Sequence, residues 1–340
     1  MVKHEMTRKE KRKSIEKLLK RNPQRSDRQL AAELYVDHKT VGMVRKDLKS
    51  RGEIPHVSNL IDSKNRVQPR YRHRVSVDIS GHDRLVIEPD TLYNVPNEVG
   101  IELMARQGLK ADAIITSIPY NCGLKYDIYK DDKPYWQYIR WLKETFRNCQ
   151  SILNIGSSVV INVGDGSNGG IPIHSDIIQF MARELDYKML GTIIWNKNHA
   201  SNPTGFGTFM SPRCPSFRTR FEYLLVFRYK DKRNIKPDGK ATISREEFLK
   251  NAFALWNIPP ETRMRKLHPA PFPLEIPHRL IQMLTYEEDL VIDIFSGIGT
   301  TAVAAKRLNR KYIGFELSPK YHEAAEKRLN DDDIKKAKAA

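Results

Sequence analysis

The sequence predicts an α/β protein with a mostly parallel sheet, preceded by a small and strongly basic helical domain. Apolar runs of strand length alternate with amphipathic stretches of helix length along most of the chain, which is typical of parallel sheets. A glycine-rich loop follows one of these runs near the carboxyl end, at residues 290–301. Positive charge is concentrated in the first 75 residues, and 340 residues suffice for one catalytic domain and one small module.

The composition excludes several classes of protein. No apolar run approaches the roughly 18 residues that a membrane span requires. The charged amino terminus does not resemble a secretory signal, so we expect a cytoplasmic protein without a membrane partner. The cysteines form no Cys-x-x-Cys pair, so we expect neither a disulfide framework nor a metal site; they are Cys122, Cys149 and Cys214.

The charge distribution marks the first domain, which we place at residues 1–75. This segment has 21 basic and 9 acidic side chains, a net charge of +12 out of the +17 of the whole chain. Three helices are expected in it, at residues 9–20, 27–34 and 39–50, because apolar residues recur three or four positions apart in each. Such a basic domain suits a polyanionic partner.

The second and third of these helices are joined by only four residues, with Ser26 as the expected N-cap of the second helix. Together with a wing or ordered linker at residues 54–74, the segment resembles winged helix-turn-helix domains of phage and plasmid regulators. The resemblance implies double-stranded DNA as partner, with the third helix in the major groove. The side chains expected to reach DNA are His38, Lys39, Thr40, Met43, Arg45 and Lys46. A basic helical bundle that contacts protein remains the alternative.

The glycine loop follows a predicted strand at residues 290–293 and precedes a predicted helix at 302–308 and a second strand that ends in Glu316. In doubly wound sheets such a loop lets a nucleotide approach the backbone, and the acid accepts hydrogen bonds from ribose hydroxyls. A dinucleotide-binding dehydrogenase has a third glycine where this chain has Ala302, so a nicotinamide cofactor is disfavoured.

The run Asp-x-Phe-x-Gly-x-Gly-Thr-Thr in this loop resembles the S-adenosyl-L-methionine loop of DNA amino-methyltransferases, with isoleucine at 294 and 298 in place of the usual Pro and Ser. The upstream segment at residues 268–273 resembles the part of the family that closes over the methionine end of this cofactor. The residues that the resemblance assigns to S-adenosyl-L-methionine are Asp90, Phe272, Asp293, Phe295, Gly297, Gly299, Thr300 and Glu316.

A second loop carries the expected chemistry. The apolar run at residues 113–115 ends in Thr-Ser-Ile-Pro-Tyr, and ligands bind at the carboxyl ends of such strands. The Ser117 hydroxyl and the Ile118 carbonyl can accept the two hydrogens of an exocyclic amino group, which makes its nitrogen a better nucleophile. Pro119 stiffens the turn, and Tyr120 would stack on a base flipped out of the duplex. The pentapeptide resembles the Ser/Asp-Pro-Pro-Tyr motif of these enzymes and departs from it at Ile118.

The order of the two loops, catalytic before cofactor, resembles the beta group of the family over about residues 84–330. The resemblance implies an S-adenosylmethionine-dependent methyltransferase fold, Rossmann-like, at residues 76–335. It also implies a restriction–modification context with a possible partner restriction endonuclease. Residues 230–266 are polar, carry many charges and include Trp256, so they are the candidate target-recognition segment; a solvated surface insertion remains the alternative. Further DNA contacts are expected from Arg213, Arg218 and Arg220.

The serine at the first motif position and the segment at residues 202–227 resemble the cytosine-N4 branch, so cytosine N4 is favoured over adenine N6. No Pro-Cys nucleophile is present, which argues against cytosine-C5 chemistry. The alternative from another class is a DNA-binding regulator with a degenerate methyltransferase domain, motivated by Ile118, Ile294 and Ile298. The sequence does not predict the oligomeric state.

Overall fold

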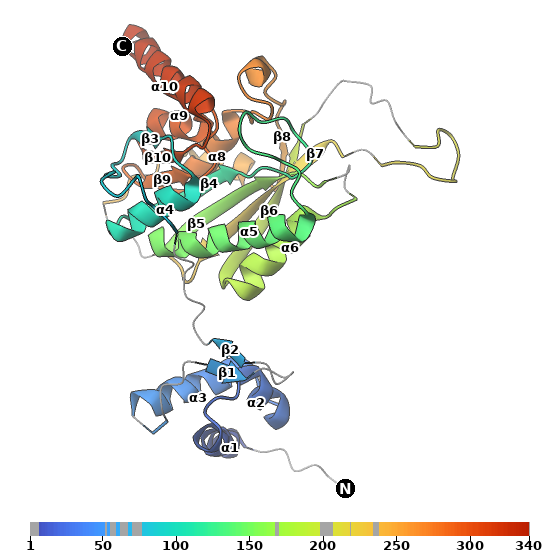
Figure 1. The fold of residues 1–340 in the computed structure, drawn as a ribbon, viewed down its shortest axis with the longest axis vertical. Coiled ribbons are helices and arrows are strands. Elements are labelled where there is room, and N and C mark those ends of the chain that lie inside the picture. The colour runs from blue at the N-terminus through green and yellow to red at the C-terminus, as the bar shows by residue number, and fades with distance from the viewer. Residues whose placement is uncertain are drawn as a thin grey trace. The chain divides into compact units, whose positions relative to one another are not determined.

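The computed structural model describes residues 7–51, 53–54, 59–61, 67–69, 77–166, 170–197, 207–217, 219–233 and 238–339. The chain divides into two compact units, Met1–Arg74 and Val75–Ala340, and each is described by itself (Figure 1). Among the described residues, no helix combines the length and the apolar character needed to cross a membrane.

The described residues of the first unit form three helices and a two-stranded antiparallel sheet: α1 (Arg8–Arg21), α2 (Asp27–Leu34), α3 (His38–Ser50), β1 (Asn59–Ile61) and β2 (Val67–Pro69). Thr7 and Ser26 cap the first two helices, each accepting a hydrogen bond from a backbone N–H three residues on. Apolar side chains of all three helices form one buried core, which includes Ile15, Leu19, Leu30, Val41, Val44 and Leu48.

Arg45 on α3 belongs to the interior of this unit, and its prediction as a DNA contact is wrong. Its exposed fraction is 1%, and its guanidinium donates to the Asp27 carboxylate at 2.7 Å and to the Pro23 carbonyl at 2.6 Å. It also donates to the carbonyl of Arg25. An arginine whose donors are taken up by the loop before α2 holds α3 against that loop and has no reach toward a groove.

The second unit is built on an eight-stranded sheet in the order β3-β10-β9-β4-β5-β7-β6-β8. Among these strands, β7 alone runs antiparallel to its neighbours, which confirms the expected mostly parallel sheet. The strands are β3 (Thr91–Tyr93), β4 (Ala111–Ser117), β5 (Leu153–Val163), β6 (Tyr187–Asn196), β7 (Phe221–Tyr229), β8 (Leu255–Asn257), β9 (Leu290–Asp293) and β10 (Lys311–Phe315).

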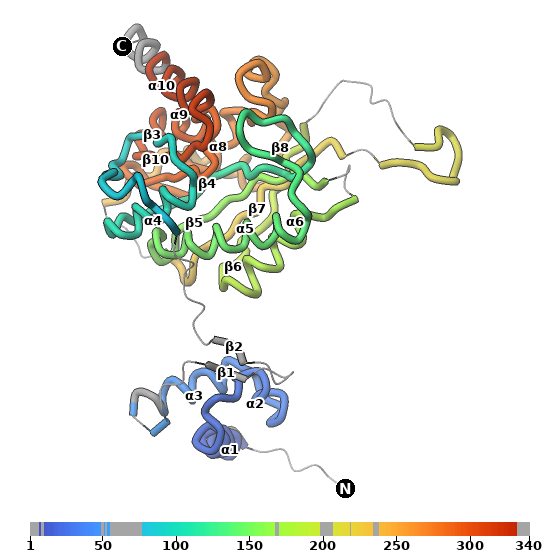
Figure 2. The backbone as a smooth tube through the Cα atoms, in the orientation of Figure 1, coloured from blue at the N-terminus to red at the C-terminus, as the bar shows by residue number. Residues whose placement is uncertain are grey.

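Helices cover both faces of this sheet (Figures 1 and 2). The first face packs against α4 (Asn97–Arg106), α5 (Tyr135–Cys149), α6 (Ile173–Gln179) and the π-helical turn Phe180–Glu184. The second face packs against α8 (Glu275–Leu284), α9 (Thr300–Arg307) and α10 (Pro319–Ala339). The central strands are buried on both faces, which explains their continuous apolar runs.

Part of the segment expected to recognise the target sequence belongs to the sheet. Residues 255–257 form β8, which pairs in parallel with β6, and α7 (Arg245–Asn251) lies just before it. Trp256 is buried in the core of the second face, and its indole N–H donates to the Asn251 carbonyl at 3.1 Å. Trp256 is therefore a packing residue, and only the remaining exposed parts of residues 230–266 are candidates for reading DNA.

Candidate active site

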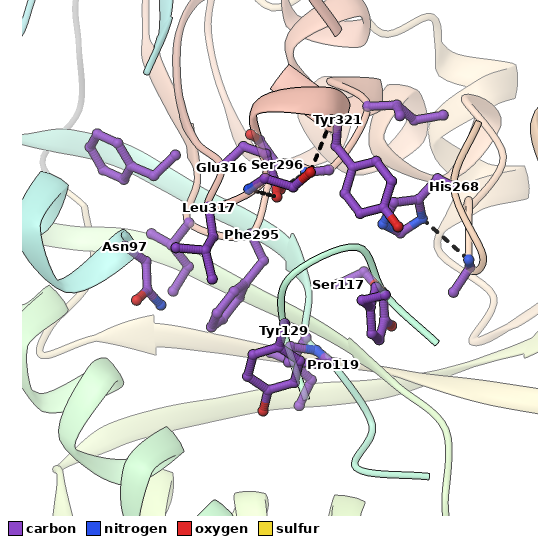
Figure 3. Close-up of a pocket in the computed structure, with 18 of the residues that line it drawn as sticks. Asn97, Ser117, Pro119, Tyr129, His268, Phe295, Ser296, Glu316, Leu317 and Tyr321 are labelled. Atoms are coloured by element: carbon purple, nitrogen blue, oxygen red, sulfur yellow. Dashed lines mark hydrogen bonds between the residues drawn. The ribbon is translucent and has the colours of Figure 1, made fainter. Parts of the chain in front are cut away.

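A pocket lies at the carboxyl edge of the parallel strands, between the loops that follow β4, β9 and β10 (Figure 3). The carboxyl ends of neighbouring parallel strands meet at one edge, so the two loops singled out in the sequence, 173 positions apart, meet here. Predicted residues that line the pocket are Ser117, Ile118, Pro119, Tyr120, Phe272, Phe295, Gly297, Thr300 and Glu316.

The glycine loop is held by the acid at the end of β10. Glu316 accepts hydrogen bonds from the backbone N–H of Gly297 at 2.7 Å and of Ser318 at 2.8 Å, and burial raises the pKa of its carboxyl. Gly297 lies in the left-handed region (φ 50°) and faces the pocket. Gly299 (φ 72°) does not line it: a Cβ there would lie 2.9 Å from the Ala325 Cβ on α10, so this glycine serves packing.

Asp293, expected to bind the cofactor, holds the loop from behind. Its side chain is buried and accepts from the hydroxyls of Thr116 and Thr301, each at 2.7 Å, and from the N–H of Phe295 at 3.1 Å. It does not line the pocket. Burial raises the pKa of its carboxyl to about 6, because its three hydrogen bonds do not fully compensate for lost hydration.

Asp90 lies at the other end of the strands, and its predicted contact with the cofactor is wrong. It precedes β3, and its carboxylate accepts from the backbone N–H of Tyr312, near the start of β10. Since β3 and β10 are parallel and the pocket is at their carboxyl ends, Asp90 is separated from the pocket by the length of the strands. The register of β3 against β10 places Asp90 there, and this register was not evident from the sequence alone.

Three polar atoms that the sequence did not single out point to a ligand in this pocket. The amide nitrogen of Asn97 and the hydroxyls of Tyr129 and Ser296 are buried and have no hydrogen-bond partner in the structure. All three residues line the pocket, and Figure 3 labels each of them. A buried polar group without a partner is costly, so these atoms are suited to bind a polar ligand.

The candidate catalytic loop, residues 117–121, is partly buried. The Tyr138 hydroxyl donates to the Pro119 carbonyl at 2.6 Å and thereby fixes the turn. Two of the three isoleucines that depart from the family motifs, Ile118 and Ile294, are core residues of the first face, so their bulk is accommodated by packing. The third, Ile298, is buried and lines the pocket. The Ser117 hydroxyl accepts from the side-chain amide of Asn162 at 3.1 Å and lies 3.5 Å from the Tyr120 hydroxyl.

A carboxylate that the sequence analysis did not single out is hydrogen-bonded to this loop. Glu222, near the start of β7, accepts a hydrogen bond from the Tyr120 hydroxyl at 2.7 Å and from the Asn162 amide at 3.0 Å. Its other oxygen is paired with Lys197 at the end of β6. Burial, and secondly the charge of Glu222, raise the pKa of Tyr120 well above its usual range. The signal available in the sequence was a lone acid beside the apolar run of a buried strand.

The chain beyond Tyr120 folds over the pocket. The buried Asp131 carboxylate accepts from the backbone N–H groups of Asn121, Cys122 and Leu124, at 2.9 to 3.1 Å. The ring of His268 packs against the rings of Tyr126 and Tyr321. Burial lowers the pKa of His268 to about 4, so this imidazole is neutral near pH 7, and its Nδ1 accepts from the Ala270 N–H at 3.2 Å.

The remaining predicted DNA contacts lie at the surface where the structure describes them. On α3, His38, Lys39, Met43 and Lys46 are exposed, and Thr40 is partly exposed. In the second unit, Arg213 and Arg220 are exposed, whereas Arg218 lies outside the described residues. No group of His, Cys, Asp or Glu side chains suited to hold a metal ion occurs in the described part of the chain.

Comparison with known proteins agrees with this geometry. A family model described as DNA methylase, for N6 and N4 methyltransferases, matches residues 111–327, more than half of the chain. The type II methyltransferase M.MjaVI of Methanocaldococcus jannaschii is 33% identical over 154 residues, which cover 45% of this chain and 78% of that protein. The type II methyltransferase M.BglII of Bacillus subtilis is 28% identical over 226 residues, which cover 63% of this chain and 62% of that protein.

Solved structures share the architecture. The structure of a putative DNA modification methylase from Thermus thermophilus, complexed with S-adenosyl-L-methionine, is 28% identical, has a TM-score of 0.56 and covers 71% of this chain and 93% of that chain. The family match includes both loops of the pocket, from β4 to the beginning of α10. The chain therefore belongs to the N6/N4 DNA methylase family.

Proposed function

We propose that this chain is a site-specific DNA methyltransferase that transfers the methyl group of S-adenosyl-L-methionine to the exocyclic amino group of a flipped base, with cytosine N4 favoured over adenine N6. One observation carries the proposal: Ser117 and Glu316, from the two loops, line the same pocket. The names of the relatives, type II methyltransferases, support a restriction–modification context in which an endonuclease cuts the same site.

The residues present fit the cofactor. The unpartnered Asn97 amide and Ser296 hydroxyl supply polar contacts, and the Glu316 carboxylate supplies acceptors suited to ribose hydroxyls. Phe272 and Phe295 supply apolar walls. The Thermus thermophilus relative, solved with this cofactor, supports the same assignment here. When bound, S-adenosyl-L-methionine supplies an electrophilic methyl group.

The catalytic loop would hold and deprotonate the amino group. The Ser117 hydroxyl and the Ile118 carbonyl accept its two hydrogens, which favours a more tetrahedral nitrogen. When the nitrogen gains a methyl group it must lose one proton. The Ser117 hydroxyl, the Tyr120 hydroxyl at 3.5 Å and the Glu222 carboxylate 2.7 Å further on form a path for that proton away from the base. Lys197 compensates for the charge of Glu222 before the proton arrives.

The first unit would bind duplex DNA and thereby bring the second unit to its substrate. Its net charge of +12 and the exposed Lys39 and Lys46 on α3 support binding to phosphates, and His38 and Met43 are exposed beside them. The preference for cytosine rests on Ser117 at the first motif position and on the resemblance of residues 202–227 to the cytosine-N4 branch.

The test is transfer of a labelled methyl group from S-adenosyl-L-methionine to mixed-sequence duplex DNA, followed by mass spectrometry of the nucleosides. We expect N4-methylcytosine, and Ser117→Ala should abolish most of the signal while calorimetry shows unchanged cofactor binding. N6-methyladenine would keep the enzyme and correct the base. No methylated base, despite measured binding of cofactor and DNA, would refute the proposal in favour of a DNA-binding regulator.

A further inference from the structure

Residues 207–217, between β6 and β7, form a tight hairpin that we call the apolar hairpin. Gly207 and Pro215 form an antiparallel bridge, and the N–H of Thr208 donates to the Cys214 carbonyl at 2.9 Å. The Thr208 hydroxyl accepts from the Cys214 N–H at 2.8 Å. Gly207 has φ 69°, and a Cβ there would lie 2.2 Å from the Cys214 carbonyl oxygen, so the closure requires glycine.

The tip of the apolar hairpin presents large apolar side chains to solvent. Phe209 is 72% exposed and Met210 is 89% exposed, with Met210 in the left-handed region at φ 54°. The Thr208 hydroxyl also donates to the Ser211 carbonyl at 3.1 Å across this turn. A turn fixed by its own hydrogen bonds yet displaying two adjacent large apolar side chains is characteristic of a contact surface. In Figure 1 this segment, drawn in yellow, stands away from the sheet.

The charge around the apolar hairpin identifies the kind of partner. No acidic residue occurs between residues 198 and 221, whereas Arg213 at the tip and Arg220 near the base are both exposed. An apolar tip with basic flanks is complementary to nucleic acid, which offers phosphates outside and an apolar base stack inside. A protein partner recognised mainly by apolar contact would not require an excess of basic over acidic residues around the hairpin.

The two strands that flank the apolar hairpin, β6 and β7, have their nearest ends beside Tyr120. The Arg220 carbonyl accepts from the N–H of Lys197 at 3.0 Å, and Lys197 pairs with Glu222, the acceptor of the Tyr120 hydroxyl. Phe217 precedes Arg220 by three residues, so their Cα atoms are at most about 11 Å apart. DNA that delivers a base to Tyr120 therefore passes the strand ends from which the apolar hairpin projects.

We propose that the apolar hairpin is a wedge that enters the base stack of the DNA at the target, with Phe209 and Met210 filling the gap left by the flipped base. The inference rests on the proposed function, because a gap forms only if a base is flipped. Apolar side chains inserted between base steps replace lost stacking, and the free energy from burying them is of the same order as the cost of unstacking. Arg213 would contact the flanking phosphates and hold the tip in register.

The decisive variant is Phe209→Ala combined with Met210→Ala. Methyl transfer is measured on a duplex that contains the methylated sequence, fully paired, and on the same duplex with an abasic position opposite the target base. We expect kcat on the paired duplex to fall at least about tenfold and kcat on the abasic duplex to stay within about twofold of the native chain, because the base is then already free to leave the stack. An equal loss on both duplexes would overturn the wedge.

A second measurement separates the wedge from the proposed activity. The native chain should bind a mixed-sequence duplex with one abasic gap several-fold more tightly than the paired duplex, and the double variant should lose that preference. The control is Trp136→Ala, which removes a similarly exposed aromatic (70%) on α5, outside both the hairpin and residues 230–266, and should keep that preference. If the native chain methylates no DNA but binds the gapped duplex more tightly, and the double variant loses this preference, the proposed activity is refuted and the wedge is not. Equal binding to both duplexes by the native chain would refute the wedge.

Discussion

Replacing Asp293 by asparagine should change how the stability of the second unit depends on pH. The carboxylate is buried between Thr116, Thr301 and the backbone of Phe295. Asparagine keeps an acceptor for Thr116 and for the backbone. Its amide group faces the Thr301 hydroxyl, which can turn its own hydrogen to the Ile115 carbonyl at 3.4 Å and accept instead. The variant therefore retains the hydrogen bonds and loses the buried charge.

The magnitude follows from the pKa of Asp293, which burial raises from 3.8 to about 6. An acid with a higher pKa in the folded state stabilises the fold while it is protonated and loses that contribution as pH rises from the unfolded pKa through the folded one. At 1.36 kcal/mol per pKa unit the whole effect is about 3 kcal/mol, of which about 2 kcal/mol falls between about pH 4.5 and pH 7.5.

The assay is urea unfolding of the native chain and of Asp293→Asn at several pH values in that range. The free energy of unfolding of the variant minus that of the native chain should rise by about 2 kcal/mol from the lowest pH to the highest. Taking the difference between the two free energies of unfolding cancels the contribution of every other titrating group whose pKa the substitution leaves unchanged. A pH-independent difference would show that Asp293 is already ionised at low pH, and a difference that falls with pH would refute the sign.

Three further changes test separate parts of the structure. Arg45→Met should lower the free energy of unfolding of the first unit by about 2 kcal/mol, measured as a lower thermal unfolding midpoint. Lys46→Met, on the exposed face, should leave the midpoint unchanged and weaken DNA binding. Gly100→Ala would place a Cβ 2.4 Å from the Phe315 ring, so a cost of about 1–3 kcal/mol and weaker calorimetric binding of S-adenosyl-L-methionine are expected. Glu222→Gln keeps a hydrogen-bond acceptor but not a proton acceptor, so kcat should fall about tenfold or more with cofactor affinity unchanged; equal loss of both would indicate a merely structural role.

The two loops of the pocket could be predicted from the sequence because each carries its information locally. The glycines after one strand and Ser-Ile-Pro-Tyr after another indicate the backbone conformation of each loop. They also indicate that each loop lies at the carboxyl end of its strand. The two loops meet because the carboxyl ends of neighbouring parallel strands lie at the same edge of the sheet. The direction of β7 and the place of β8 at the edge carry no such signal, because they depend on pairing between distant segments.

The residues that sequence reasoning misplaced or missed depend on such distant partners. Asp90 precedes a strand whose register with β10 joins positions more than 200 residues apart. Arg45 looks like any exposed cation of a basic helix until the carbonyls of the loop before α2 are known to surround it. Glu222 and Asn162 lie in apolar strands, where a polar side chain is itself a hint of function, but only the antiparallel pairing of β5 with β7 brings them together.

The strand order imposes a delay on folding. The inner strand β4 hydrogen-bonds with β9, where Ile114 lies beside Ile292, so one edge of β4 stays unpaired until about 178 more residues have been made. At a typical 5–20 residues per second the ribosome needs roughly 10 to 35 seconds for this stretch. Throughout that time a bare, apolar strand edge of the kind that nucleates aggregation is exposed. A nascent chain of this enzyme is therefore a natural client for chaperones that shield apolar strands, and chains that end before β9 should be insoluble.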